Sequence, residues 1–407
     1  MKLVKLSLAT ALVAGALTTT SFATPLEEAV KDVDLGGYMF VRYTFNQNKD
    51  KVFGSDANSS KHKTNGVWRF KSEVNLKTKV DDNFFGVAGL RIDANGQNTR
   101  DGGAVAKAPY DVYNLHLGYN VGGTTVLVGR QNIDTFFTDD LFGDGVAVLN
   151  SDIEGLTLAA LWMDNLYKDG NIVDDVYAIV DENATLANKI RDRVVNNDLF
   201  GAAVIGSYDP IAFQLWAARL TSTADLYAGE VSGSFDVADD VNVGFKAQVG
   251  TSKINKNFKD EMGVDGTTFF GGELSSAFFG ADVAAGYVQY GKKDKLSLVS
   301  LEDDGKFLKA GEQASFNYSL FQDKNNALYV TAGYAIPDSD VNVGLDYVHH
   351  ENKAEDSKTK QDEIVARAGY AYNSKLNFSG YASYLKVKAG EDKTNNTQVR
   401  FTAKYSF

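Results

Sequence analysis

The sequence predicts an all-β fold, a transmembrane antiparallel up-and-down β-barrel of about 18 strands. Three observations lead to this prediction. Apolar and polar residues alternate in segments of about ten residues, short and long connections follow one another in turn, and turn-forming and aromatic residues are abundant. The chain of 407 residues contains 38 glycines, 25 phenylalanines and 20 tyrosines but only 4 prolines. Chains made of many strands and tight turns have this composition.

The last segment shows the alternation most clearly. Apolar residues occupy every second position of Val399–Phe407, and polar or charged residues lie between them. Successive side chains of a strand point to opposite faces, so one face is apolar and the other polar. Segments Val241–Gly250, Val341–Tyr347 and Ile364–Tyr372 repeat the pattern. Soluble sandwiches also alternate, but here the polar faces carry small residues and isolated charges, as a water-filled lumen does.

Aromatic residues gather at the ends of these segments, where two interfacial girdles of a barrel are expected. The girdle prediction includes Tyr38, Tyr43, Phe45, Phe84, Phe85, Tyr110, Tyr119, Tyr208, Phe278, Phe279, Tyr290, Tyr405 and Phe407.

The connections alternate in length, as short periplasmic turns and long external loops require. Short turns are expected at Asp81–Asn83, Gly122–Gly123, Ser151–Glu154, Asp209–Pro210, Val237–Asp240, Gly280, Pro337–Asp340 and Asn373–Lys375. Long connections are expected at Asn46–Asn65, Asn95–Pro109, Asn132–Gly143, Asn165–Asn197, Thr221–Ala224, Lys253–Asp265, Lys292–Asn325, Glu351–Gln361 and Ala389–Asn395. An even strand number places both termini at the turn end, and closure satisfies every backbone group in lipid. Strands near Val146–Asn150 and Gly266–Phe279 are the weakest, so about sixteen or twenty strands are the alternatives.

The N-terminus predicts export. Lys2 and Lys5 precede the apolar run Leu6–Leu17, and Ser21 and Ala23 occupy the positions that a signal peptidase recognises. Residues 1–23 are therefore expected to be a cleaved secretory signal peptide, and residues 24–407 a single barrel domain. No later stretch approaches the about 18 consecutive apolar residues of a spanning helix.

Charge and cysteine content exclude several classes of protein. The chain contains no cysteine, so it has neither disulfides nor cysteine-ligated metals. Its formal net charge is -12, whereas nucleic-acid binding requires clustered lysine and arginine. No nucleic-acid partner is therefore expected. An acidic protein that encloses a pore favours cations inside it.

The stretch Val126–Asp144 predicts a loop that folds into the pore at about residues 132–144. It combines carboxylates with Phe136, Phe137, Leu141 and Phe142. Exposed apolar area costs about 25 cal/mol per Å², so these side chains are expected to pack against the wall. An ordinary external loop with local packing is the alternative. The acidic constriction is assigned to Asp134, Asp139, Asp140 and Asp144.

Basic residues on early strands form a candidate wall opposite these acids. The residues assigned to it are Arg42, Arg69, Lys71, Arg91 and Arg130. Opposed charges across a narrow water gap create a transverse field and set the ion preference of a pore. Alternatively, the arginines merely solvate a wide lumen. Further lumen carboxylates are expected on later strands at Glu230, Glu273 and Asp346.

Metal and enzyme hypotheses carry less weight. No cofactor is assigned, although carboxylates this close together in sequence are also a hypothetical Ca²⁺ site. The four histidines are His62, His116, His349 and His350, with His116 expected in the lumen and His349 on the membrane face. No serine lies in a recognisable nucleophile elbow, so an enzyme such as an outer-membrane hydrolase is disfavoured.

The sequence resembles a known family at both ends. Segments Met1–Ala9 and Thr24–Asp34 and the terminal Tyr405–Phe407 are similar to the major outer membrane protein porins of epsilonproteobacteria. The resemblance implies a trimeric, weakly selective porin of about eighteen strands in the bacterial outer membrane. Gly129–Gln131 and the acidic segment after it also resemble the constriction-loop region of general trimeric porins.

These observations predict passive diffusion of ions and small hydrophilic solutes, with a mild cation preference. The expected partners are outer-membrane lipid, solutes and two further copies of the chain. One alternative is a substrate-specific channel, which requires lumen aromatics, and only Tyr329 and Tyr381 are assigned inward. A structural or adhesin barrel with host-binding loops is another. A short helix is expected at Val173–Arg191, and Lys292–Asn325 is expected to be partly ordered, both with little functional weight.

Overall fold

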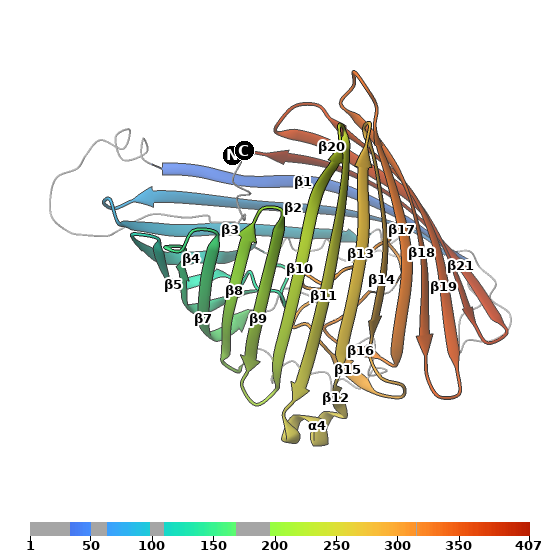
Figure 1. Ribbon diagram of the computed structural model, residues 1–407, viewed down its shortest axis with the longest axis horizontal. Coiled ribbons are helices and arrows are strands. Elements are labelled where there is room, and N and C mark those ends of the chain that lie inside the picture. Colours follow the sequence, from blue (N-terminus) through green and yellow to red (C-terminus); the bar gives the residue numbers. More distant parts are fainter. Residues whose placement is uncertain (1–32, 50–62, 98–109, 168–195, 315) are drawn as a thin grey trace.

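Eighteen strands form one antiparallel sheet that closes on itself in the computed structural model (Figure 1). The structure describes residues 33–49, 63–97, 110–167, 196–314 and 316–407. The barrel strands are β1 (Val33–Lys49), β2 (Lys63–Lys79), β3 (Phe84–Gln97), β4 (Tyr110–Val121), β5 (Thr124–Asn132), β6 (Phe142–Asn150), β7 (Leu156–Tyr167), β8 (Leu199–Tyr208), β9 (Ile211–Leu220), β10 (Ala224–Ala238), β11 (Val241–Ile254), β13 (Thr268–Phe278), β14 (Ala281–Tyr290), β17 (Lys324–Ala335), β18 (Val341–Lys353), β19 (Lys358–Ala371), β20 (Leu376–Ala389) and β21 (Asp392–Ser406). The predicted fold and strand number are confirmed.

Pairing between the first and last strands closes the barrel. The register runs from Tyr38 opposite Ser406 to Lys49 opposite Asn395. Main-chain hydrogen bonds join Gly37 and Phe407 in both directions, each at 3.1 Å. Closure leaves no strand edge without a partner, which is a requirement for a sheet in lipid.

Connections are short at the end that holds the termini and mostly longer at the other end. The turn between β4 and β5 has only Gly122 and Gly123, whereas β14 and β17 are separated by residues 291–323. Gly122 has φ of 57°, a left-handed conformation that glycine adopts without strain. The two weakest strand predictions lie in β6 and β13. The general pattern of turns and loops is confirmed, but the long connections predicted at Thr221–Ala224 and Ala389–Asn395 are turns of three and two residues.

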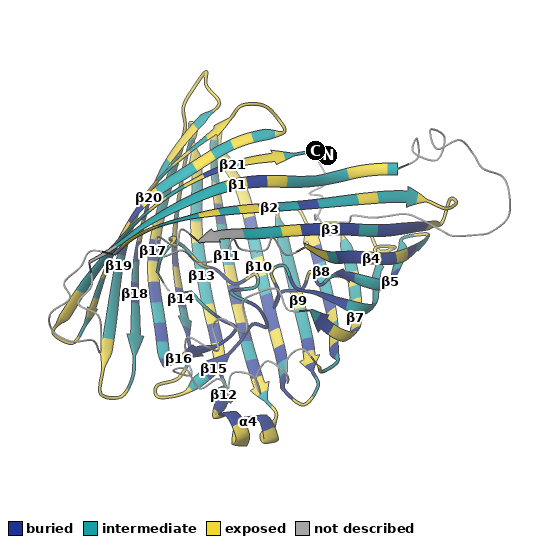
Figure 2. Cartoon of the chain, turned by 180° about the vertical axis from the view of Figure 1, so that it is seen from behind, coloured by how far each residue is buried: buried dark blue, intermediate teal, exposed yellow. Residues whose placement is uncertain are grey.

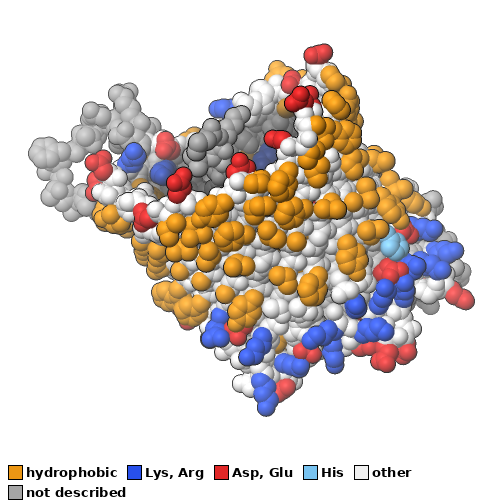
Figure 3. Space-filling view, viewed as in Figure 1, with side chains coloured by type: hydrophobic (Ala, Val, Ile, Leu, Met, Phe, Trp, Pro, Cys, Tyr) orange, Lys and Arg blue, Asp and Glu red, His pale blue; other side chains and the backbone are white. Residues whose placement is uncertain are grey.

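The outer surface carries a continuous apolar band over the strands (Figure 3). Leu117, Val128 and Leu274 are among its exposed members. Residues alternate along each strand between this band and the interior, as the burial colours of β10 and β11 show (Figure 2). A surface of this kind suits hydrocarbon rather than water.

Three residues assigned to the aromatic girdles lie inside instead. Tyr38 faces Glu73 across β1 and β2. Phe85 is buried with Lys77 over its ring at 4.5 Å, and Tyr290 packs on Tyr318 with ring centroids 4.7 Å apart. The prediction used only the position of each aromatic residue near the end of a segment, which does not tell whether its side chain points outward or into the lumen. Strict alternation along the strand does distinguish the two faces.

Short elements lie in the loops at the far end. Helix α4 (Lys256–Met262) begins after Asn255, whose side chain accepts a hydrogen bond from the Asn257 N–H, and ends at Gly263. Strands β12 (Val264–Gly266), β15 (Leu296–Leu298) and β16 (Phe321–Gln322) form a separate small sheet. Among the described residues, no helix is long and apolar enough to cross a membrane. The predicted signal peptide, His62 and the predicted helix at Val173–Arg191 lie outside the described residues.

Candidate pore constriction

Loop 3, residues 133–141 between β5 and β6, folds inward and is rigidly built. The Ile133 N–H donates to the Leu141 carbonyl at 2.8 Å, which closes the loop at its base. Thr138 donates its hydroxyl to the Ile133 carbonyl and accepts the Thr135 N–H at 3.0 Å. Phe136 and Phe137 are 0% exposed. The predicted packing of apolar loop residues inside the barrel is therefore what the structure shows.

Loop 7, residues 291–323 between β14 and β17, enters the barrel and covers loop 3. The rings of Phe136 and Phe307 meet edge to face with centroids 4.9 Å apart. The Phe137 carbonyl accepts the Leu301 N–H at 2.8 Å, and the Phe136 carbonyl accepts the Lys306 N–H at 2.9 Å. Two loops far apart in sequence are thus joined through main chain and side chains.

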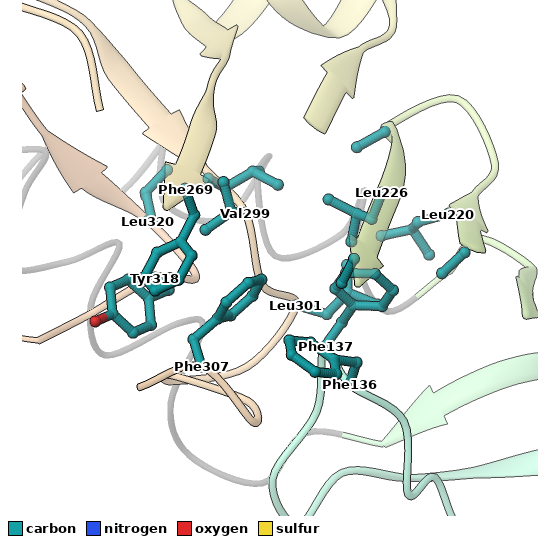
Figure 4. Close-up of a cluster of buried hydrophobic side chains, with 14 of the residues drawn as sticks. Phe136, Phe137, Leu220, Leu226, Phe269, Val299, Leu301, Phe307, Tyr318 and Leu320 are labelled. Atoms are coloured by element: carbon teal, nitrogen blue, oxygen red, sulfur yellow. The ribbon is translucent and has the colours of Figure 1, made fainter. Parts of the chain in front are cut away.

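An apolar cluster holds both loops to the wall (Figure 4). It includes Leu220 and Leu226 from β9 and β10, and Phe269 from β13. Phe307 and Tyr318 of loop 7 contact Phe269, with ring centroids 4.5 and 5.2 Å away. Edge-to-face aromatic pairs add about 0.5–1.5 kcal/mol each beyond area burial, so the loops form a fixed partition within the lumen.

Glu302 of loop 7 fixes the backbone of loop 3. Its Oε2 accepts the N–H groups of Asp139, Asp140 and Leu141 at 2.9, 3.1 and 2.8 Å. The side chain is 1% exposed, and burial raises its pKa to about 8. Sequence reasoning missed this residue. The run Leu296–Leu301, apolar apart from two serines, was the signal that part of the charged loop is buried.

Asp140 binds the basic wall directly. Its Oδ2 lies 2.6 Å from Lys71 Nζ and 3.8 Å from Arg91 Nη1. Glu73 completes the network, 2.9 Å from Arg91 Nε and 3.3 Å from Lys71 Nζ. Burial alone would raise the pKa of Asp140, but Lys71 and Arg91 hold it below its ordinary value. No water gap separates acid from base here, because loop 3 rests on β2 and β3.

The assignment of Arg130 and Asp144 to the lumen is wrong. Arg130 lies opposite Leu115 in the register of β4 and β5, and Leu115 is 57% exposed on the outer band. Directly paired residues share a face, so Arg130 lies on the outer side of the wall. Asp144 pairs with it from β6, with Oδ1 2.8 Å from Nε. Asp144 was assigned to the loop because it follows the other acids closely in the sequence, but it belongs to β6, which begins at Phe142.

Arg42 and Arg69 do face the lumen, and Arg400 on β21 joins them. Arg42 lies over the Phe40 ring at 4.6 Å, and Arg69 forms an ion pair with Asp93. Arg400 and Arg69 are close charged neighbours of Arg42. Sequence reasoning placed Arg400 on a polar face but omitted it from the wall, because only closure brings the last strand beside the first.

The tip of loop 7 crosses to the opposite wall. Glu363 of β19, which is 0% exposed, accepts the N–H groups of Glu312, Gln313 and Ala314 at 3.1, 3.0 and 2.9 Å. Ser383 of β20 donates to the same carboxylate at 2.5 Å. Loop 7 therefore spans the bore, and it brings the Glu312 carboxylate within 3.5 Å of Arg400.

Two further acids of loop 3 are exposed, whereas Asp304 of loop 7 is buried. Asp134 lies 3.2 Å from Lys306, Asp139 is exposed, and Asp304 lies 2.7 Å from Lys309. Burial raises the pKa of Asp304. Among the described residues, no three side chains of the metal-ligating types gather at one point. The calcium hypothesis thus gains no site from this geometry, and equilibrium dialysis is its test.

The other lumen carboxylates lie where they were predicted. Glu230 accepts from Gln214 at 3.0 Å and from Gln248 at 2.5 Å. Glu273 accepts from Tyr329 at 2.8 Å, and Asp346 forms an ion pair with Arg367 at 3.0 Å. A cavity of about 430 Å³ lies between loop 3 and the wall, lined in part by Asp134, Lys246 and Glu230. Most of the side chains that line this cavity are apolar, with four charged side chains among them.

More aromatic side chains face the interior than the two that were assigned there. Tyr381 has Arg400 over its ring at 5.0 Å, as Arg42 lies over Phe40. Tyr113 has Arg91 over its ring at 4.8 Å. The sequence argument against a substrate-specific channel, that lumen aromatics are nearly absent, is therefore wrong.

Each of the two lumen histidines among the described residues contacts a neighbouring polar group of the protein. His116 Nδ1 lies 3.0 Å from the Arg130 carbonyl, and His350 Nε2 lies 3.3 Å from the Tyr290 hydroxyl. His349 faces outward, as expected, with Nδ1 2.7 Å from Asp362.

A family model described as Campylobacter major outer membrane protein matches residues 1–407. The chain belongs to this family. Family membership and the closed barrel place the chain in the outer membrane as a porin. The resemblance at the chain ends is thereby confirmed, and a channel is favoured over an enzyme.

Solved structures share the fold of this family member at low sequence identity. OpdL of Pseudomonas aeruginosa has a TM-score of 0.67 at 12% identity, over 92% of this chain and 99% of its own. OccAB3 of Acinetobacter baumannii has a TM-score of 0.67 at 12% identity, over 92% and 100%. OpdK of P. aeruginosa, solved with vanillate, has a TM-score of 0.65 at 12% identity, over 92% and 99%. No curated protein sequence matches the chain.

Proposed function

We propose that the protein lets ions and small hydrophilic solutes diffuse passively through a water-filled pore, with a mild preference for cations. The observation that carries this proposal is the joint constriction by loops 3 and 7. Its loop side presents Asp139 and Glu312, and its wall side presents Arg42, Arg69 and Arg400. Carboxylates on a fixed partition attract cations, while opposing arginines keep that preference small.

The wall arginines are held in place, which supports a lasting transverse field. Arg42 donates from Nε to the Thr402 hydroxyl at 3.2 Å, and Arg400 donates from Nε to the Thr44 hydroxyl at 3.2 Å. The loop carboxylates are equally fixed, because loop 7 is anchored at Glu363. Preorganised charges orient dipolar solutes without reorganising at each passage.

Reversal potentials in a salt gradient across a planar bilayer test the ion preference. Asp139→Asn should move the reversal potential toward anion preference. The matched control is Asp239→Asn, an exposed carboxylate in the β10–β11 turn, which should change it little. Equal shifts in both variants would show that general surface charge, rather than the constriction, sets the preference.

A substrate-specific channel is the second candidate, and the arginines stacked on lumen aromatics favour it. Arg42 over Phe40 and Arg400 over Tyr381 offer both a cation and an aromatic face to an aromatic carboxylate. OpdK was solved with vanillate. Single-channel recordings with added vanillate separate the candidates. A diffusion porin should show no saturable block, whereas a specific channel should show block that Arg42→Ala weakens.

We also propose that the barrel forms a homotrimer, which its membership of a porin family supports. Native mass spectrometry in mild detergent measures the subunit number, and a monomer would contradict this proposal.

A further inference from the structure

Rows of outward side chains on β18–β20 mark the edge of the apolar band. In the registers of these strands, Tyr347 lies opposite Ile364, and Ile364 lies opposite Tyr384. All three side chains are exposed on the outer face. Tyrosines at the end of an apolar band occur at the membrane interface. The next rows toward the loops, about 7 Å apart along the strands, therefore lie at the level of lipid headgroups.

Lysines dominate these next rows. On β18–β21, six outward lysines stand against two outward carboxylates, Glu351 and Asp362. This basic patch consists of Lys353, Lys358, Lys360, Lys386, Lys388 and Lys393. Lysine and arginine side chains gather directly beside the apolar band at the loop end (Figure 3). The positive charge of the patch thus begins where the hydrocarbon-facing surface stops.

The two carboxylates do not neutralise the patch. Glu351 is shared among Lys353 at 2.7 Å, Lys360 at 3.4 Å and Lys358. Asp362 accepts the Tyr347 hydroxyl at 3.0 Å and contacts His349 at 2.7 Å.

Two lysines of the patch form no ion pair with the described residues. Lys388 and Lys393 are exposed, and no carboxylate among the described residues lies within 4.0 Å of their ammonium groups. Lys386 is also exposed and lies opposite Asp362 in the register of β19 and β20. The β18–β19 loop beyond the patch carries the exposed acids Glu355 and Asp356. Excess positive charge is therefore confined to a band at headgroup level.

We propose that the basic patch binds the phosphate groups of a phosphorylated glycolipid of the lipid A type in the outer leaflet. The long loops place this end of the barrel on the external side. Acyl chains would lie along the apolar band below the tyrosine row, and the phosphates would meet the lysines above it. Each lysine near an anionic membrane surface adds appreciable binding free energy, so several acting together retain a lipid. Continuity with the apolar band distinguishes this occupant from a soluble anion or an acidic protein.

Native mass spectrometry of the full-length protein in detergent tests the proposal. The probe is bisphosphorylated lipid A, compared with the same lipid after phosphatase treatment. The patch variant carries Lys360→Gln, Lys386→Gln and Lys388→Gln. The control variant carries Lys256→Gln, Lys293→Gln and Lys295→Gln, which remove the same charge from exposed positions on α4 and loop 7. Unchanged heat-modifiable gel mobility establishes that both variants are folded.

The expected result is about tenfold or greater weakening of lipid A binding in the patch variant and none in the control. Dephosphorylated lipid should bind the unmodified protein as weakly as lipid A binds the patch variant. Equal weakening in both variants, or binding that is indifferent to the phosphates, would overturn the proposal. Full displacement of lipid A by millimolar inorganic phosphate would also overturn it, because the patch would then be a site for free anions.

Discussion

Glu302 shows how one buried carboxylate can organise a loop that belongs to another part of the chain. Three backbone N–H groups of loop 3 would have no acceptor without it. A buried N–H group left without an acceptor costs about 1–3 kcal/mol, so the Glu302 side chain stabilises the folded conformation of loop 3. Asp140 in turn joins loop 3 to the wall, through its ion pair with Lys71.

The Glu302 carboxyl makes the constriction sensitive to pH. Burial raises its pKa to about 8 from an ordinary 4.5, so the folded loops bind its proton more tightly than unfolded loops do. The contribution of Glu302 to stability is therefore complete below about pH 4.5 and is lost as the pH rises through 8. Open-channel current noise should increase between pH 5 and pH 9. Glu302→Gln should flatten this dependence, and an unchanged profile in that variant would contradict the assignment.

Asp140→Asn should loosen loop 3. The change leaves Lys71 and Arg91, both buried, with Glu73 as their remaining carboxylate, at a cost of about 1–3 kcal/mol. The measurement is the protease sensitivity of loop 3 in the folded barrel. Asp134→Asn is the matched control, because its pair with Lys306 is solvated and contributes about 0–1 kcal/mol. Equal sensitivity of the two variants would show that the buried network is not what holds the loop.

At the scale of elements, the constriction is a product of two loops rather than one. Loop 3 supplies the phenylalanines, and loop 7 supplies both the surface that buries them and the carboxylate that caps their backbone. The aromatic contact between Phe136 and Phe307 links the two.

Phe136→Ala should separate the loops. Removing a fully buried phenylalanine costs about 3–5 kcal/mol, much of it from the cavity that remains. Single-channel conductance should rise and fluctuate, and trypsin should cut at Lys306 or Lys309. Phe136→Leu, which keeps most of the volume, should behave closer to the original protein. Stable, unchanged conductance in Phe136→Ala would show that loop 7 holds its place without this contact.

The alternation of apolar and polar residues predicted the barrel strands from the sequence. The arrangement of the loops inside the barrel could not be predicted in this way, because it depends on contacts between distant residues. Alternation and the phenylalanines of Val126–Asp144 were local signals, and they located the strands and the inward loop. The pairing of Glu302 with loop 3 joins residues 163 positions apart and has no local signal. The prediction that Arg130 faces the lumen was wrong for a different reason, because a shift of one residue along a strand moves a side chain to the other face.

At the scale of the molecule, closure determines which residues become neighbours. Arg42 and Thr402 are 360 positions apart in the chain and 3.2 Å apart in the barrel. The basic wall is complete only because β21 pairs with β1. The same closure aligns the outward rows on β18–β21 that form the basic patch.

Removal of residues 399–407 should abolish the folded barrel. It would leave the polar backbone of β1 without partners along most of its pairing with β21, and unpaired backbone groups in lipid cost several kcal/mol each. The measurement is heat-modifiable mobility on gels after refolding in detergent. Deletion of Glu355 and Asp356 in an external loop is the control and should fold. A folded band from the truncated chain would show that β1 and β20 can close the barrel themselves.

The seam between β1 and β21 also constrains how the molecule can be built. The two strands that meet there come from opposite ends of the chain, so the barrel is complete only when the last strand has reached the first. Until that pair forms, the free edge of β1 is a template for any other extended chain. Assembly of this protein therefore has to shield that edge until all eighteen strands are in place.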